Sequence, residues 1–80
     1  MWANGTIWTN KGKIGYDYFV KYYEAGSEYG IENDGRISKL VIRRHGENRD
    51  LVRYDRGWDL PVPNSDEIRG VYAILLEKYN

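Results

Sequence analysis

Residues 54 to 59, YDRGWD, form the densest group of aromatic, charged and glycine residues in the sequence. Tyrosine, arginine and tryptophan combine a large contact area with specific polar groups, and these residue types dominate the energetics of protein interfaces. Tyr54, Arg56 and Trp58 are therefore candidates for a binding corner. In the structural alternative, Gly57 permits a bulge or bend and Trp58 closes an open edge of the core.

His45 is the only histidine, and general acid and base catalysis most often uses this residue. With Arg43 or Arg44 on a scissile phosphate, His45 could serve a small metal-independent ribonuclease. It falls in an expected hairpin turn, however, where a histidine is normally solvated. Asp55 and Asp59 are four residues apart, a spacing that aligns carboxylates on a helix but not on a bent strand.

Glycine and cysteine usage argue against a cofactor. Gly26, Gly30 and Gly35 do not have phosphate-loop or dinucleotide spacing and fit turns, where glycine permits positive φ. Cysteine is absent, so neither a disulfide framework nor a thiolate metal site is available. The sequence therefore predicts a non-enzymatic protein without a cofactor or metal.

Four segments have the properties of β-strands. Residues 13 to 23 alternate between the two sides of a strand, and residues 2 to 9 show the same period. Residues 10 to 12, Asn-Lys-Gly, make a plausible tight turn between them. Residues 36 to 44 and 50 to 56 add two strands joined by a hairpin-sized connection. The expected buried side of the second strand comprises Ile14, Tyr16, Tyr18, Val20 and Tyr22.

The last segment changes to a helical period. Asn64 is placed to cap this helix, with Glu67 three residues later as in a capping box. The predicted fold is α+β, a four-stranded antiparallel meander sheet with one C-terminal helix packed on one face, in a single domain over residues 1–80. The apolar stripe of the helix comprises Ile68, Val71, Tyr72, Leu75 and Tyr79.

One helix can cover only one face of such a sheet, so the other face stays open to water or to a partner. This predicts a module that binds a protein partner, with Phe19 and Tyr23 as anchors. A homodimer through this face, or through the edge of the first strand, fits equally well because exposed edges invite pairing. The alternative is a solvated face stabilised by cross-strand pairs. The charged residues expected there are Lys13, Asp17, Lys21, Lys39 and Arg43.

Basic residues concentrate between positions 36 and 56, although twelve Lys and Arg balance twelve Asp and Glu in the whole chain. Basic side chains interleaved with aromatic ones on a sheet suit base stacking and phosphate contacts. A platform for single-stranded nucleic acid is therefore the alternative function. The residues concerned are Arg36, Lys39, Arg43, Arg44, Arg49, Arg53 and Arg56.

Targeting signals are lacking at the amino terminus, which has neither the basic start nor the apolar run of a signal peptide. No stretch approaches the roughly 20 apolar residues of a membrane span. These features predict a soluble, cytoplasmic protein that does not bind membranes.

Three short strings carry a family resemblance: SEYGI at 27–31, GRISKL at 35–40 and YDRGWD at 54–59, followed by a helix that ends in the form ILLxxY. They resemble an uncharacterised family of small proteins from gut bacteria and their mobile elements. The resemblance covers nearly the whole chain. It implies a self-contained small domain of phage or mobile-element origin, with no known activity and no catalytic residues to transfer.

Overall fold

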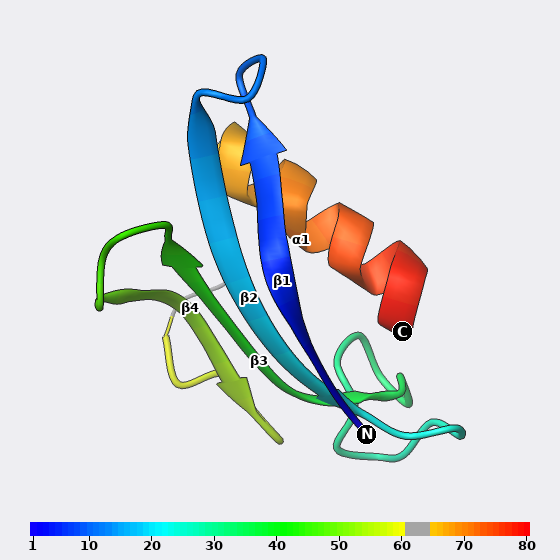
Figure 1. Ribbon diagram of the computed structural model, residues 1–80. Helices are drawn as coiled ribbons and strands as arrows, with labels where there is room; N and C mark the ends of the chain where they lie inside the picture. The colour runs from blue at the N-terminus through cyan, green and yellow to red at the C-terminus, as the bar shows by residue number, and fades with distance from the viewer. Residues whose placement is uncertain (61–64) are drawn as a thin grey trace.

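Within residues 1–60 and 65–80, which the structure describes, the computed structural model contains four strands followed by one helix (Figure 1). The elements are β1 (Trp2–Thr9), β2 (Ile14–Tyr22), β3 (Ile37–Arg44), β4 (Asp50–Asp55) and α1 (Asp66–Tyr79). The strands form one antiparallel sheet in the order β1-β2-β3-β4. The predicted α+β meander is confirmed.

The β1–β2 hairpin has the tight turn that the sequence predicts. Asn10, Lys11 and Gly12 all have positive φ, at 50°, 56° and 82°. The N–H of Gly12 donates to the carbonyl oxygen of Thr9 at 3.0 Å. Left-handed residues in a short connection match the right-handed twist of the two strands. The register then continues along both strands from this turn.

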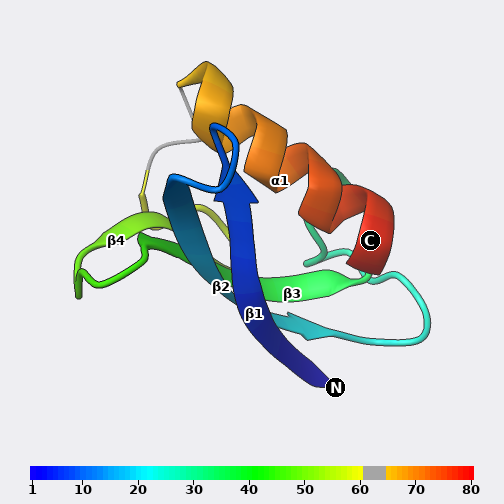
Figure 2. The same ribbon diagram turned by 45° about the horizontal axis from the view of Figure 1, so that its top comes forward.

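The core lies between the sheet and α1, which crosses one face (Figures 1 and 2). Val20 and Leu75 are fully buried there, and the hydroxyls of Tyr18 and Tyr79 lie 3.2 Å apart. Removing this apolar surface from water contributes about 25 cal/mol per Å². The remaining buried hydrophobic residues are Tyr16, Ile31, Ile37, Leu40, Ile42, Val52, Tyr54, Val71 and Tyr72.

The start of α1 differs from the prediction. Asn64, the expected cap, lies outside the described residues, and the cap is Ser65, whose side-chain oxygen accepts from the N–H of Ile68 at 3.1 Å. Glu67 does not face this cap, because its Oε1 accepts from Thr9 Oγ1 of β1 at 2.5 Å. It thereby ties the first turn of the helix to the sheet. In the described part of the chain, no helix is both long and apolar enough to cross a bilayer.

The connection between β2 and β3 uses its glycines for space. A Cβ added to Gly30 would lie only 1.7 Å from the carbonyl oxygen of Gly35. The prediction that the glycines of this connection supply positive φ is wrong, because the left-handed residues are Glu32, Asn33 and Asp34, at 62°, 61° and 61°. Two backbone segments approach so closely here that a side chain cannot fit between them.

Candidate functional site

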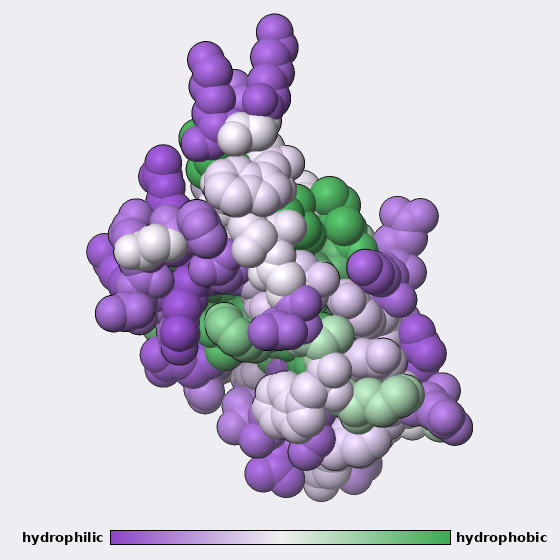
Figure 3. All heavy atoms as spheres, in the orientation of Figure 1, coloured by the Kyte–Doolittle hydropathy of each residue, from purple (hydrophilic) through white to green (hydrophobic). Residues whose placement is uncertain are grey.

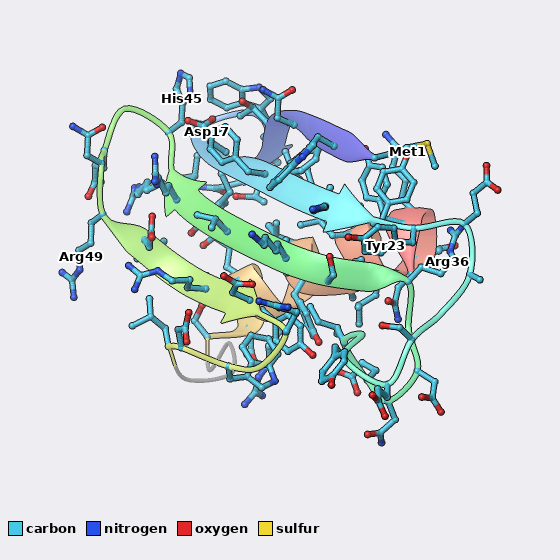
Figure 4. All side chains as sticks on the ribbon, turned by 90° about the horizontal axis from the view of Figure 1, so that it is seen from below. Met1, Asp17, Tyr23, Arg36, His45 and Arg49 are labelled. Carbon is cyan, nitrogen blue, oxygen red and sulfur yellow. The ribbon has the colours of Figure 1, made fainter. Side chains whose placement is uncertain are left out.

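Figure 4 shows the face of the sheet that α1 leaves open. At its centre, cross-strand register places Phe19 between Asn4 of β1 and Val41 of β3, and the Phe19 side chain is 38% exposed. Five charged or aromatic residues expected on this face are in register there: Asp17, Phe19, Lys21, Lys39 and Arg43.

Two other residues expected on this face lie outside the strands. Lys13 is in the hairpin turn before β2 and is exposed to solvent, so it is not part of the strand face. Tyr23 follows the last residue of β2 and is also exposed. The ammonium of Lys21 lies 5.6 Å from the centroid of the Tyr23 ring, within the range of a cation–π contact. Tyr23 therefore borders one end of the face.

Asp50 connects two arginines across this face. Its Oδ1 accepts from Nε of Arg43 at 2.5 Å, and its Oδ2 lies 2.9 Å from Nη2 of Arg53. The Arg43 hydrogen bond is the main cause that holds the pKa of the Asp50 carboxyl below its ordinary value. The guanidinium of Arg43 also lies 5.6 Å from the centroid of Phe19. Both arginines are thus paired with Asp50, and Arg43 lies beside the central aromatic ring.

The lowered pKa of Asp50 predicts a pH dependence of stability. The ionised carboxylate stabilises the fold at neutral pH, and this contribution is lost as the pH falls below the unfolded value of about 3.9 and through the lower folded value. We expect Asp50→Asn to lower the free energy of unfolding by about 1 kcal/mol at pH 7, with the deficit shrinking by pH 2.5. Urea titrations at both pH values measure it. Glu24→Gln, in an exposed loop, is the control, and an equal Asp50→Asn deficit at both pH values would contradict the assignment.

A second polar cluster lies next to the first, because Asp17 is the cross-strand partner of Arg43. Asp17 and His45 are labelled together in Figure 4. Asp17 accepts a hydrogen bond from Thr6 Oγ1 at 2.7 Å, and its Oδ1 lies 2.8 Å from Nδ1 of His45. The bond from Thr6, followed by that to His45, lowers the pKa of Asp17. The His45 ring also packs edge-on against Trp8, with ring centroids 5.2 Å apart. His45 is exposed, as predicted for a turn, and is held by two neighbours.

The residues of the ribonuclease hypothesis are divided between the two faces. Adjacent strand residues point in opposite directions, so Arg43 shares the open face with Asp17 while Arg44 lies opposite Tyr16 on the helix side. The nearest acid to Arg44 in an ion pair is Glu47, at 4.0 Å. Of the two arginines that the hypothesis offers, Arg43 is therefore the one on the same face as Asp17, the hydrogen-bond partner of His45.

Tyr54 and Trp58 of the predicted corner hold the structure together. Tyr54 is buried, and its hydroxyl donates to the carbonyl oxygen of Tyr29 at 2.7 Å. The Trp58 ring packs edge-on against Tyr54 and against Tyr72 of α1, with centroid separations of 5.1 and 5.9 Å. These contacts join the end of β4 to the helix and to the β2–β3 connection. Trp58 thus closes the edge of the core, as the structural alternative proposes.

Arg56 makes the bend next to this corner. It is Arg56, rather than Gly57, that has positive φ, at 57°. The N–H of Asp55 donates to the carbonyl oxygen of Gly57 at 2.8 Å, and the N–H of Arg56 donates to that of Ser38 at 2.9 Å. These backbone bonds hold the turn, while the Arg56 side chain extends into solvent.

The three residues of the predicted corner line two different surface hollows. Arg56 and Tyr23 line a hollow of about 360 Å³ that also includes Lys21, Lys39 and Tyr29. Asp55 lies near its rim, 3.9 Å from Nζ of Lys39 and 3.8 Å from Nε of Arg56. Trp58 and Tyr54 line a different hollow of about 500 Å³, beside Glu28 and Glu32. The three residues of the corner therefore do not form a single site.

Two tryptophans of β1 join the candidate surface without having been singled out from the sequence. Trp2 and Trp8 lie on the open face and are 63% and 53% exposed. The ammonium of Lys21 lies 5.5 Å from the centroid of the Trp2 ring. One signal was available: the whole of β1, WANGTIWT, contains no charged residue, which is unusual for an exposed strand.

The basic residues between positions 36 and 56 do not form one continuous stripe. Lys39, Arg43 and Arg53 are on the open face, whereas Arg44 is on the other face. Arg36 and Arg49 lie at opposite ends of the molecule (Figure 4). Three cations, Lys21, Lys39 and Arg56, line the Arg56 hollow.

Comparison with family models places the chain in a family. No curated protein and no solved structure matches it. One family model, described as a domain of unknown function (DUF7678), matches residues 1–80. This agrees with the expectation that the chain belongs to a family of small uncharacterised proteins. The chain belongs to the DUF7678 family over its whole length.

Proposed function

We propose that the protein is a small, non-enzymatic, cytoplasmic interaction module that binds a protein partner through the open face of its sheet. The observation that supports this most directly is the central position of Phe19 on a face that α1 does not cover, with Trp2 and Trp8 exposed beside it. Aromatic anchors of this kind contribute most of the binding energy at protein interfaces.

The charges around Phe19 favour a protein over a polyanion. Arg43 and Arg53 are both bound to Asp50, and His45 lies against Asp17. Because these charges are largely compensated within the face, they produce little net positive field to attract phosphate backbones. They supply instead the mixed polar surroundings that are usual at the rim of a protein interface.

Mutation of the open face tests this function. We expect Phe19→Ser to weaken partner binding at least about tenfold, because a central aromatic anchor is lost. Immobilised wild-type protein, Phe19→Ser and the control Ala73→Ser, on the exposed side of α1, are compared in nuclease-treated host lysate. A partner retained equally by Phe19→Ser and wild type would exclude the open face as its binding surface.

Single-stranded nucleic acid is the second candidate, and the Arg56 hollow favours it. Three cations, Lys21, Lys39 and Arg56, line this hollow together with Tyr23 and Tyr29. Phosphate contacts and base stacking need this combination. Fluorescence anisotropy with single-stranded oligonucleotides tests it: affinity should fall steeply with salt and be lost in Lys21→Glu/Lys39→Glu. Absence of binding at low salt would remove this candidate.

The genomic setting follows from the sequence resemblance. We propose that the gene belongs to a phage or mobile element, in which case its partner is a protein of the element or of its host. The genes on either side provide the test. Phage or transfer genes are expected there, and flanking housekeeping genes in several genomes would argue against this origin.

A further inference from the structure

β1 is an edge strand that lacks the usual protection against pairing. Between Trp2 and Thr9 it contains no charge and no proline, and its register with β2 shows no bulge. In the described structure no strand lies beyond it, since the sheet order begins with β1. Natural proteins normally protect long open edges with charges, prolines, bulges or covering segments. The outer edge of β1 is therefore available to another strand.

The opposite edge of the same sheet is protected in two ways. β4 carries charges at Asp50, Arg53 and Asp55. Its outer edge is also occupied by the returning chain, because the N–H groups of Asp59 and Leu60 donate to the carbonyl oxygen of Arg53 at 3.0 and 3.3 Å. The contrast between the two edges indicates that the open edge is a feature of β1 and not of the sheet as a whole.

The hydrogen-bond alternation identifies which groups of β1 are free to pair. Met1 and Tyr22 exchange two backbone bonds, at 2.9 and 2.6 Å. In an antiparallel ladder such pairs alternate with pairs that are not hydrogen-bonded. Ala3, Gly5, Ile7 and Thr9 therefore bond to β2, so the residues that direct their N–H and C=O groups outward are Trp2, Asn4, Thr6 and Trp8.

The residue types of β1 are arranged symmetrically about Gly5. Read from Gly5 in either direction, β1 presents a small uncharged polar residue, then an aliphatic residue, then a tryptophan. An antiparallel two-fold axis at Gly5 places Trp2 opposite Trp8 of a second copy, and Asn4 opposite Thr6 of that copy. Both pairings join residues whose backbone N–H and C=O groups point outward. The hydrogen-bonded ladder between the two copies can therefore form in this register.

The helix side of this edge is apolar as well. Ile74 lies seven residues after Glu67 on α1, which puts both on the side of the helix that faces Thr9 of β1. Ile74 is 48% exposed and Ile7 is only partly buried. Figure 3 shows hydrophobic side chains, in green, between the upper part of β1 and α1. The aliphatic residues of a second β1 would point to this side and cover them.

We propose that the protein forms a two-fold symmetric dimer in which β1 pairs antiparallel with β1 of a second copy about Gly5. The symmetry of the strand favours a second copy over a strand of another protein, because an isologous interface requires a self-complementary surface. The dimer joins the two sheets into one and places their open faces side by side. This self-association is independent of the proposed partner binding, which uses the face rather than the edge.

Cysteine cross-linking tests the register, and the chain has no native cysteine to interfere. Asn4→Cys and Thr6→Cys are purified separately, mixed and oxidised. Directly opposed residues in a hydrogen-bonded pair have Cα atoms about 5.5 Å apart, which a disulfide can span. The mixture should give a covalent dimer at least about fivefold faster than either variant alone. Single variants that cross-link as fast as the mixture would overturn the register.

Charges introduced at the same pair test the dimer itself, with the association measured by sedimentation equilibrium. Wild type is expected to be dimeric, and Asn4→Lys/Thr6→Lys should raise the dissociation constant at least about tenfold, because like charges then face each other twice. Asn4→Lys/Thr6→Glu, which puts opposite charges face to face, should retain the dimer. Circular dichroism checks that both variants fold. A wild type that stays monomeric at about 0.5 mM, a concentration at which dimers of about 1 mM affinity are detectable, would overturn the proposal. So would equal dissociation constants for the two double variants.

Discussion

Replacing Gly30 with alanine is expected to lower the free energy of unfolding by about 3 kcal/mol or more. The new Cβ would lie 1.7 Å from the carbonyl oxygen of Gly35, and the obstacle is backbone, which cannot rotate away as a flexible side chain can. The neighbouring Ile31 is in the core, 1% exposed, with its N–H donating to the carbonyl oxygen of Ile37 at 3.0 Å. Moving the backbone at Gly30 therefore also displaces a core residue.

Gly70 provides the matched control for this substitution. It lies within α1, and a Cβ added there meets no atom within 4 Å. Alanine is more favourable than glycine in a helix by about 1 kcal/mol, so Gly70→Ala should stabilise the protein. Urea denaturation followed by circular dichroism measures both variants. A Gly30→Ala protein as stable as wild type would show that the β2–β3 connection can rearrange without disturbing the core.

The second large effect is expected at Leu75. This side chain is 0% exposed at the centre of the helix stripe, between Val71 and Tyr79, and it packs in the same cluster as Val20 of the sheet. Leu75→Ala should cost about 2–5 kcal/mol through lost burial and the cavity left behind. For a small domain this is a large share of the total stability, so thermal unfolding should begin far below that of wild type.

The adjacent Leu76 is the control for Leu75, since the two changes delete the same atoms one position apart. Leu76 is only partly buried against the core, so Leu76→Ala should cost less than half as much as Leu75→Ala, about 1 kcal/mol. Both are measured by urea titration at one protein concentration, because dimer formation would make stability concentration-dependent. Equal losses at the two positions would mean that a different side of α1 faces the sheet.

The hydrophobic core and the candidate binding surfaces lie on different sides of the sheet. The fully buried residues, such as Val20, Leu40 and Leu75, lie between the sheet and α1. Phe19 and the two tryptophans of β1 lie on the open face or beside its free edge. Binding residues can therefore be changed while the core remains intact, so variants of the open face test function with little effect on folding.

Much of the fold was predictable from local signals. The period of two in β2 placed Tyr16, Tyr18 and Val20 on the buried side, and the helical period placed Leu75 in the stripe that covers them. The Asn-Lys-Gly turn was also correctly located. These features follow from backbone geometry and side-chain alternation over a few residues, which the sequence records directly.

The candidate site was less predictable because it depends on which segments become neighbours. Tyr54, Arg56 and Trp58 are consecutive alternate residues, yet Arg56 faces one hollow and Trp58 another, since the left-handed turn at Arg56 reverses the chain. The loop glycines were read as turn residues, whereas their role depends on a backbone segment that the fold brings within contact distance.

By itself, the sequence determined the strands, the helix, their order and the buried sides of β2 and α1. The tertiary structure decided that Asp50 compensates Arg43 and Arg53, that the returning chain occupies the edge of β4, and that the edge of β1 stays open. The physical reason is that periodicity is a local property of the chain. Compensation of charge and coverage of an edge depend instead on strand register and on contacts between distant segments.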